Sequence, residues 1–231
     1  MEAIWDGLVE AFRLFGTGDG ELFSIAGRSL LVSGSATALA MLVGVPLGYL
    51  LGRARFPART LILAAVGTGM GMPPVVAGLV IWLLLVRSGP FGGFELIYTK
   101  QAMIIAQFLI ATPLVIAFTA ASIQALPARL PDLLAVLGAG KLRTLWLLAR
   151  EARLGLLAAV MAGFGAVVSE VGASMAVGGN LVGDTRVLTT AIVTETSRAD
   201  TERAIAYGLV LLAMAFAIVA VLTVVQQRSP R

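Results

Sequence analysis

The stretch PDLLAVLGAGKLRTLWLLAREAR, residues 131–153, decides how the rest of this 231-residue chain is interpreted. It is the longest break between strongly apolar segments in the middle of the chain. Its pattern predicts a short helix, a turn that contains Gly138 and a second helix. The loop is also basic, with Arg129, Lys141, Arg143, Arg150 and Arg153. A loop with this much predicted structure between two apolar segments is typical of a surface that a partner grips.

The composition is that of a membrane protein. The chain is 58% hydrophobic and 13% charged, with a mean hydropathy of +0.94. Soluble domains have about 45–50% apolar and about 25% charged residues. The absence of Cys and His excludes thiolate metal sites, haem ligation and Cys or His catalysis, so no metal site and no catalytic residue is predicted. The pI near 10.1 would suggest nucleic acid in a soluble protein, but here basic loops are interpreted as orientation signals in a lipid bilayer.

Five segments are long enough to cross the hydrocarbon core, which needs about 20 apolar residues. Four of them contain no charged residue, and the fourth in chain order contains only Glu170. We therefore expect an all-α integral membrane protein in which residues 1–231 form a single transmembrane domain. The expected spans are 29–52, 61–86, 102–126, 154–178 and 204–226.

Charge asymmetry predicts the orientation. The loops 53–60 and 127–153 and the C-terminal tail together carry ten Lys or Arg and two acids. The segments on the other side carry seven basic residues and ten acids. Basic loops favour the cytoplasm, so the N-terminus is expected outside and the C-terminus inside. Residues 3–15 predict a short interfacial helix, with an apolar face formed by Ile4, Trp5, Leu8, Phe12 and Phe15.

Several residues within the spans are candidates for a path or a gate. Pro73 and Pro74 indicate either a kinked packing helix or a broken helix that lines a path. Gly44, Gly48 and Gly52 form a small face that suits close helix packing, either within one subunit or between subunits. Glu170 could couple protons, line the path or anchor the bundle by hydrogen bonds, and the absence of a second charge within the spans favours the anchor.

The segment 179–203 predicts a re-entrant or interfacial loop-helix on the outer side, although an ordinary loop fits its residues equally well. Its hydrogen-bond donors could suit an anion. Together with Ser174, the pathway candidates here are Asn180, Thr185, Arg186, Thr189 and Thr190.

The run AVLGAGKLRT suggests a phosphate-binding loop, but it fails the test. That motif needs Gly where Ala135 stands and a hydroxyl where Leu142 stands. The chain is therefore not expected to hydrolyse ATP itself, and no enzyme activity is predicted.

The loop does resemble that of ATP-binding-cassette (ABC) importer permeases, whose pattern is E-A-A, three residues, G, nine residues, I-x-L-P. With Gly138 as the anchor, Asp132, Leu133 and Leu134 take the first three positions and Leu148 the Ile position, while Arg150 and Glu151 depart from L-P. Other stretches resemble tungstate-type permeases, relatives of molybdate and sulfate permeases, and the likeness runs from about residue 20 to 225. They are GMPPVVAGL (71–79), RSGPFG (87–92), AMIIAQ (102–107), SEVGASMAVGGN (169–180) and TRVLTTAI (185–192).

The resemblance implies a type I importer permease in a bacterial or archaeal cytoplasmic membrane. It would be a homodimer with two cytoplasmic ATPase subunits and an external oxyanion-binding protein; ATP would bind the ATPases, and this chain would hold no cofactor. Residues 132–144 would form a coupling helix that docks on the ATPase, and 145–153 would join it rigidly to the fourth span. The implied contact residues are Asp132, Leu133, Leu134, Leu137, Gly138, Ala139, Lys141 and Leu142.

The alternatives are a permease for molybdate, sulfate, phosphate or another solute, a stand-alone secondary transporter or channel, and a scaffold that does not transport. No Lys or Arg lies within the five expected spans, so selectivity is expected to reside in the binding protein.

Overall fold

The computed structural model describes residues 2–54 and 56–227, and within these ranges every regular element is helical. This confirms the predicted all-α class. The helices are α1 (Glu2–Gly16), α2 (Gly20–Arg53), α3 (Arg59–Met70), α4 (Pro74–Leu85), η1 (Gly92–Phe94), α5 (Lys100–Gln124), α6 (Leu130–Val136), α7 (Lys141–Glu151), α8 (Arg153–Val168), α9 (Gly172–Gly178), α10 (Leu188–Ser197) and α11 (Thr201–Gln227).

Three helices are each long and apolar enough to span a membrane: α2, α5 and α11. Two further crossings are interrupted between helices. The segment 61–86 is divided into α3 and α4, which meet at 102°. The expected continuous span 154–178 is wrong in detail, because α8 ends at Val168 and α9 starts only at Gly172. Glu170 therefore lies in a break between helices and not inside one.

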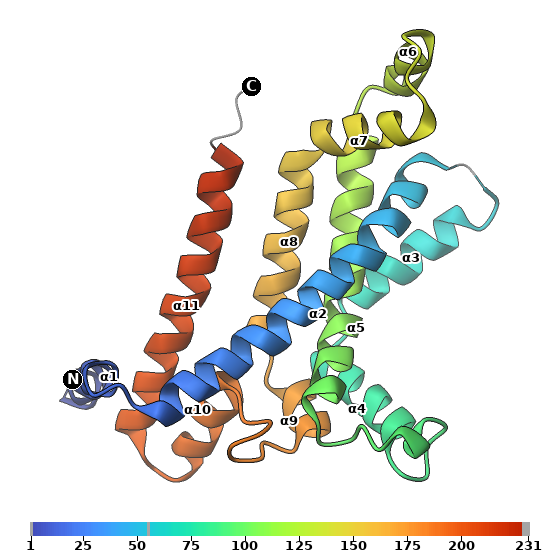
Figure 1. Cartoon of the computed structure of the whole chain (residues 1–231). Coiled ribbons are helices and arrows are strands. Elements are labelled where there is room, and N and C mark those ends of the chain that lie inside the picture. Colours follow the sequence, from blue (N-terminus) through green and yellow to red (C-terminus); the bar gives the residue numbers. More distant parts are fainter. Residues whose placement is uncertain (1, 55, 228–231) are drawn as a thin grey trace.

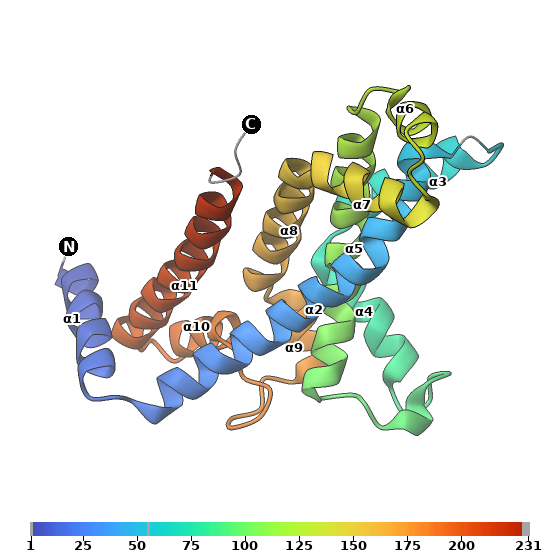
Figure 2. The same ribbon diagram turned by 45° about the horizontal axis from the view of Figure 1, so that its top comes forward.

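The two ends of the bundle carry different elements. In Figures 1 and 2, α6, α7 and the C-terminus lie at one end, and α1, α9 and α10 lie at the other. Helix α2 runs diagonally across α5 and α8 and packs against both. The predicted arrangement of the loops on two opposite sides matches this separation.

The small-residue face of α2 is used within the chain. A Cβ atom on Gly44, Gly48 or Gly52 would lie only 2.7, 2.6 or 2.9 Å from a side-chain atom of Val115, Thr119 or Ile123 on α5, respectively. These glycines let the two backbones approach closely, which supports the interpretation of packing inside one subunit. The α2–α5 contact forms the centre of the bundle.

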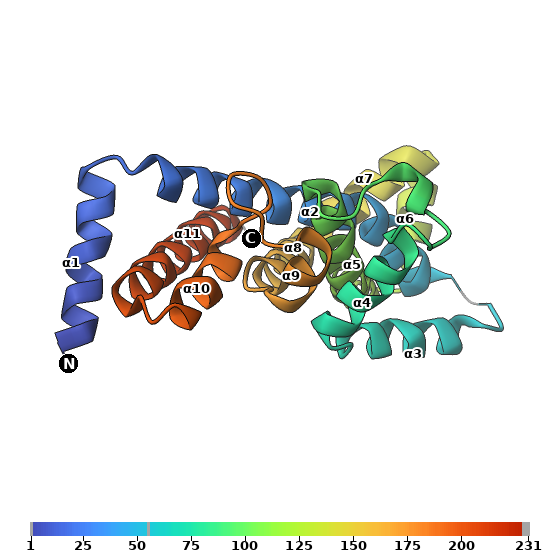
Figure 3. The same ribbon diagram turned by 90° about the horizontal axis from the view of Figure 1, so that it is seen from below.

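A second apolar cluster joins α1, α10 and α11 to the start of α2. Helix α1 lies across the end of α11 (Figure 3), as expected for an interfacial helix. Ala11 and Leu14 are buried, whereas Trp5 and Phe12 are exposed. The side chain of Ile4 lies outside the described residues.

Candidate functional site

The break between α3 and α4 lies next to the break between α8 and α9. A Cβ atom on Gly172, the first residue of α9, would be 2.5 Å from Cγ2 of Val75 in the first turn of α4. One turn further along α4, a Cβ atom on Gly78 would be 2.6 Å from the Cα of Ala173. Helices α4 and α9 therefore pack as a close pair that begins where both crossings are interrupted.

Paired prolines set the first break. Pro73 is the N-cap of α4, with φ −56° and ψ 127°, and Pro74 is its first residue. Proline is favoured at this position because its missing N–H would have no helical partner there. The two prolines thus start a new helix, which decides in favour of the broken helix over the kinked one.

Glu170 organises the second break. Its side chain is buried, and its Oε1 accepts a hydrogen bond of 2.7 Å from the backbone N–H of Ala173. Its backbone carbonyl accepts a hydrogen bond of 2.9 Å from the hydroxyl of Thr189. A carboxylate at a helix N-terminus pairs with free N–H groups and with the positive end of the helix dipole. These contacts are those of a structural anchor.

A buried polar pair joins α9 to α5. Nε2 of Gln107 donates to Oγ of Ser174 at 3.1 Å, and both side chains are almost fully buried. Oε1 of Gln107 has no hydrogen-bond partner within the described part of the chain. Ser174 was among the predicted pathway residues and Gln107 was not. The position of Gln107, an amide inside an apolar span, is a sequence signal that could have identified it.

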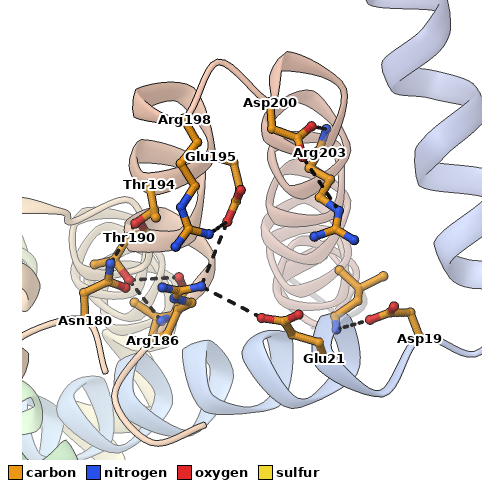
Figure 4. A network of polar contacts seen from close by, with 12 residues as sticks. Asp19, Glu21, Asn180, Arg186, Thr190, Thr194, Glu195, Arg198, Asp200 and Arg203 are labelled. Carbon is orange, nitrogen blue, oxygen red and sulfur yellow. Dashed lines mark hydrogen bonds and ion pairs between the residues drawn. The ribbon is translucent and has the colours of Figure 1, made fainter. Parts of the chain in front are cut away.

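Three polar candidates of the 179–203 segment, Asn180, Arg186 and Thr190, lie in one polar network (Figure 4). The buried side chain of Arg186 places Nη1 3.9 Å from a carboxylate oxygen of Glu21 and 3.9 Å from one of Glu195. Arg198 also pairs with Glu195, at 3.3 Å. The guanidinium of Arg186, which the sequence suggested as a group that could bind an anion, is therefore already neutralised by two carboxylates.

Nε of Arg186 has no hydrogen-bond partner in the described part of the chain, whereas the hydroxyl and amide donors of Asn180, Thr185 and Thr190 are occupied. The hydroxyls of Thr185 and Thr190 donate to the backbone carbonyls of Gly178 and Val187. Nδ2 of Asn180 donates to Oγ1 of Thr194 at 2.7 Å. The hydrogen bond from Asn180 to Thr194 holds the 179–187 loop against α10. In this conformation the donors of Asn180, Thr185 and Thr190 face protein acceptors.

The 131–153 stretch forms a helix, a turn and a helix, as its pattern predicted. The single coupling helix expected over 132–144 is wrong, because Gly138 lies in a turn with φ +79° between α6 and α7. The turn closes with hydrogen bonds from the N–H groups of Gly138 and Ala139 to the carbonyls of Ala135 and Leu134. Glycine adopts this backbone conformation without steric cost.

The surface of this stretch carries exposed apolar side chains beside its basic residues. Leu133, Val136, Leu137 and Leu142 are 58–86% exposed, and α6 projects beyond the bundle (Figure 1). Helix α7 is tied down by Leu148, which is fully buried, and it meets α8 at 69°. Helix α7 thus joins the fourth span through a bend at Ala152.

Interrupted crossings that meet at their breaks, together with a projecting apolar loop at one end of an all-helical bundle, define the membrane-embedded subunit of a transporter. The chain belongs to the family of binding-protein-dependent transport system inner membrane components, whose sequence pattern matches residues 44–230.

Relatives cover nearly the whole chain. It is 40% identical to a tungstate uptake system permease protein of Peptoclostridium acidaminophilum, over 98% of this chain and 100% of the relative. It is 38% identical to a probable anion ABC transporter permease of Haloferax volcanii, over 90% and 92% of the two chains. A tungstate permease of Campylobacter jejuni is 35% identical, over 94% and 90%.

The fold also matches a solved structure. The MetNI methionine ABC transporter, in an inward-facing conformation, superposes with a TM-score of 0.73 at 16% identity. The match covers 91% of this chain and 97% of that one. The expected type I ABC-importer fold is thereby confirmed.

Proposed function

We propose that this chain is the permease subunit of an ATP-driven oxyanion importer and that its substrate is tungstate. The proposed transport path rests on one observation: the break between α3 and α4 contacts the break between α8 and α9. Gly71, Pro73 and Ser169 are exposed at these interruptions. Backbone without helical hydrogen bonds at membrane depth is stable only where protein or water covers it. The breaks therefore suit the wall of a water-filled path that a second copy of the chain completes.

The chemistry of the breaks suits passage of an anion without tight binding. No Lys or Arg occurs in residues 60–86 or 154–185, which contain both interruptions. A fixed cation here would trap a dianion, and none is present in these stretches. The carboxylate at the second break, Glu170, accepts a hydrogen bond at the start of α9. Selectivity then belongs to an external binding protein that delivers the substrate. The two tungstate permeases among the relatives support tungstate as that substrate.

The energy source is a partner subunit. The exposed apolar side chains of α6 and the following turn, with Asp132 at the start of α6 and Lys141 and Leu142 at the start of α7, form the surface for a cytoplasmic ATPase. Closure of two ATPases on a homodimer would move α7, and the bent α7–α8 joint would pass that movement to the break at Glu170. The basic loops favour a cytoplasmic position for this end and an external N-terminus.

Copurification tests the assembly. The chain is expressed with the ATPase and the binding protein encoded beside it, extracted in mild detergent and captured by a C-terminal tag. The proposal expects two permease chains and two ATPases in the complex. Calorimetry on the isolated binding protein tests the substrate separately: tight tungstate binding supports the proposal, and no oxyanion binding contradicts it. A permease that never retains an ATPase would favour a stand-alone transporter.

A further inference from the structure

Helix α5 has a proline beside the two helix breaks. Pro113 lies inside α5, and a Cβ atom on Gly69, in the last turn of α3, would be 2.8 Å from its Cγ. The break between α8 and α9 adjoins the same region, since Gly172 meets Val75 in the first turn of α4. Three crossings, formed by α3–α4, α5 and α8–α9, therefore lose regular helical hydrogen bonding at neighbouring positions.

Helix α5 is also weakened at this point by its neighbouring hydroxyl. Proline has no N–H, so position 113 gives no helical hydrogen bond to the carbonyl of Leu109. The hydroxyl of Thr112 donates to the carbonyl of Phe108 at 2.6 Å. Interior prolines bend helices, and so do hydroxyls that bond to the carbonyl four residues earlier. Position 113 is thus a point at which α5 can bend at low cost.

On one side of these interruptions, α4, α9 and the first half of α5 are braced to one another (Figure 1). Gly78 already brings the backbones of α4 and α9 together. A Cβ atom on Gly178, at the end of α9, would be 2.7 Å from Sδ of Met103 on α5. The N–H of Tyr98, just before α5, donates to the carbonyl of Val177 at 2.8 Å. Residues 74–112 and 172–179 therefore form one packed unit, which we call the α9 body.

The other side of the interruptions is packed separately. The three close glycine contacts of α2 meet α5 at Val115, Thr119 and Ile123, all beyond Pro113. Helix α8 packs on the same half of α5, where a Cβ atom on Gly155 would overlap with the side chain of Ser122. The second half of α5 is therefore held by α2 and α8.

We infer that Pro113 and the two breaks form a hinge, on which the α9 body turns against α8 and the second half of α5 during transport. Hinges are a few loop or element-terminal residues that absorb backbone changes while packed segments move as units. Pro113 is then a positioning residue for transport, because an α5 without this weak point would splint both breaks. The use of the hinge rests on the proposed transport function, whereas the packing of the α9 body does not.

Engineered disulfides test the hinge, since the chain has no cysteine. Val75→Cys with Gly172→Cys joins α4 to α9 within the α9 body, where the Cβ of Val75 lies 3.6 Å from the Cβ position of Gly172. Ala111→Cys with Gly163→Cys joins the first half of α5 to α8 across the hinge, with a Cβ separation of 3.8 Å. Both separations suit a disulfide.

Each double variant is reconstituted with its ATPase and binding protein and compared with itself after oxidation by copper phenanthroline and after reduction by dithiothreitol. The oxidised 75–172 pair should keep the uptake of its reduced form. The oxidised 111–163 pair should lose uptake and regain it on reduction. Loss of uptake in the oxidised 75–172 pair, or full uptake in the oxidised 111–163 pair, would overturn the hinge. Absence of uptake in the wild type would instead contradict the proposed function.

Substitutions of Pro113 test the same hinge without a crosslink. Pro113→Ala supplies an N–H for the carbonyl of Leu109 and should lower the maximal uptake rate severalfold without lowering the melting temperature. Pro113→Gly supplies the same N–H but keeps a flexible backbone, so it should retain more uptake than Pro113→Ala. Pro46→Ala is the control, because Pro46 is also inside a helix but faces Tyr49 and Leu156 across a surface groove. Wild-type uptake in Pro113→Ala would overturn the hinge.

Discussion

Glu170 and Ala173 are joined across the break between α8 and α9: the carboxylate Oε1 accepts a hydrogen bond of 2.7 Å from the backbone N–H of Ala173. This contact fixes the start of α9, which packs closely on α4. A carboxylate inside a membrane is costly, and the Glu170 side chain offsets this cost by fixing the position of α9 relative to α8.

This role predicts different results for two substitutions at Glu170. Glu170→Gln keeps an oxygen that can accept from Ala173, so transport should be retained with a modest loss of stability. Glu170→Ala removes the cap and should cost about 1–2 kcal/mol of stability. Thermal unfolding and ATP-driven uptake of both variants provide the measurement. Loss of uptake in Glu170→Gln as complete as in Glu170→Ala would indicate proton coupling and contradict the anchor.

Gly78 predicts that α4 and α9 work as a pair. A Cβ atom at Gly78 would approach the Cα of Ala173 to 2.6 Å, and backbone cannot move aside as a flexible side chain can. We expect Gly78→Ala to cost about 1–3 kcal/mol by overpacking and to reduce uptake. Gly67→Ala on α3 is the matched control, since no atom lies within 4 Å of its Cβ position. Equal melting temperatures for the two variants would show that the close approach is unimportant.

Arg186 and Glu195 predict a strong coupling. Both are buried, and removal of Arg186 leaves the buried Glu195 with only the largely exposed Arg198 as a partner, which should cost part of the about 3–5 kcal/mol expected for breaking a buried pair. Arg186→Met should therefore destabilise the fold much more than Arg198→Met, because Arg198 is a largely exposed partner worth about 0–1 kcal/mol. A double-mutant cycle with Glu195→Gln, followed by thermal unfolding, measures the coupling. An additive cycle would mean that Arg186 is free for another role, such as anion binding.

Gly138 tests the coupling surface. Its φ of +79° disfavours any side chain, although the space around it is open. Gly138→Ala should distort the α6–α7 turn and lower the amount of substrate moved per ATP hydrolysed. Gly140→Ala is the control, because its φ is −66° and its surroundings are equally open. Unchanged coupling in Gly138→Ala would remove the turn from the contact with the ATPase.

Much of the fold followed from local sequence. Long apolar runs predicted the crossings, and the Gly44–Gly48–Gly52 spacing predicted the close face that packs on α5. Pro73 and Pro74 marked one break because proline acts on its own backbone. The second break carried no proline, and the local hydrogen bond from Ala173 to Glu170, three residues apart, is compatible with either a cap or a polar residue inside a span.

The candidate site was less predictable because its contacts join distant residues. Gln107 meets Ser174 across 67 positions, and the partners of Arg186 come from two different helices. Asn180, Thr185 and Thr190 were predicted as pathway residues, and in the structure their donors bond to Thr194, Gly178 and Val187. The helix–turn–helix pattern of residues 131–153 predicted the turn at Gly138. The coupling helix that the family resemblance implied over 132–144 ran through that turn, which separates α6 from α7 in the structure.

The most direct measurement of the central claim is tungstate uptake into proteoliposomes that contain the permease with its ATPase, with the binding protein added outside. Uptake should require both the binding protein and ATP hydrolysis, and it should be insensitive to an imposed proton or sodium gradient. Excess unlabelled tungstate should compete with labelled tungstate far better than sulfate does. Uptake that proceeds without ATP, or that an ion gradient drives through the permease alone, would contradict the account.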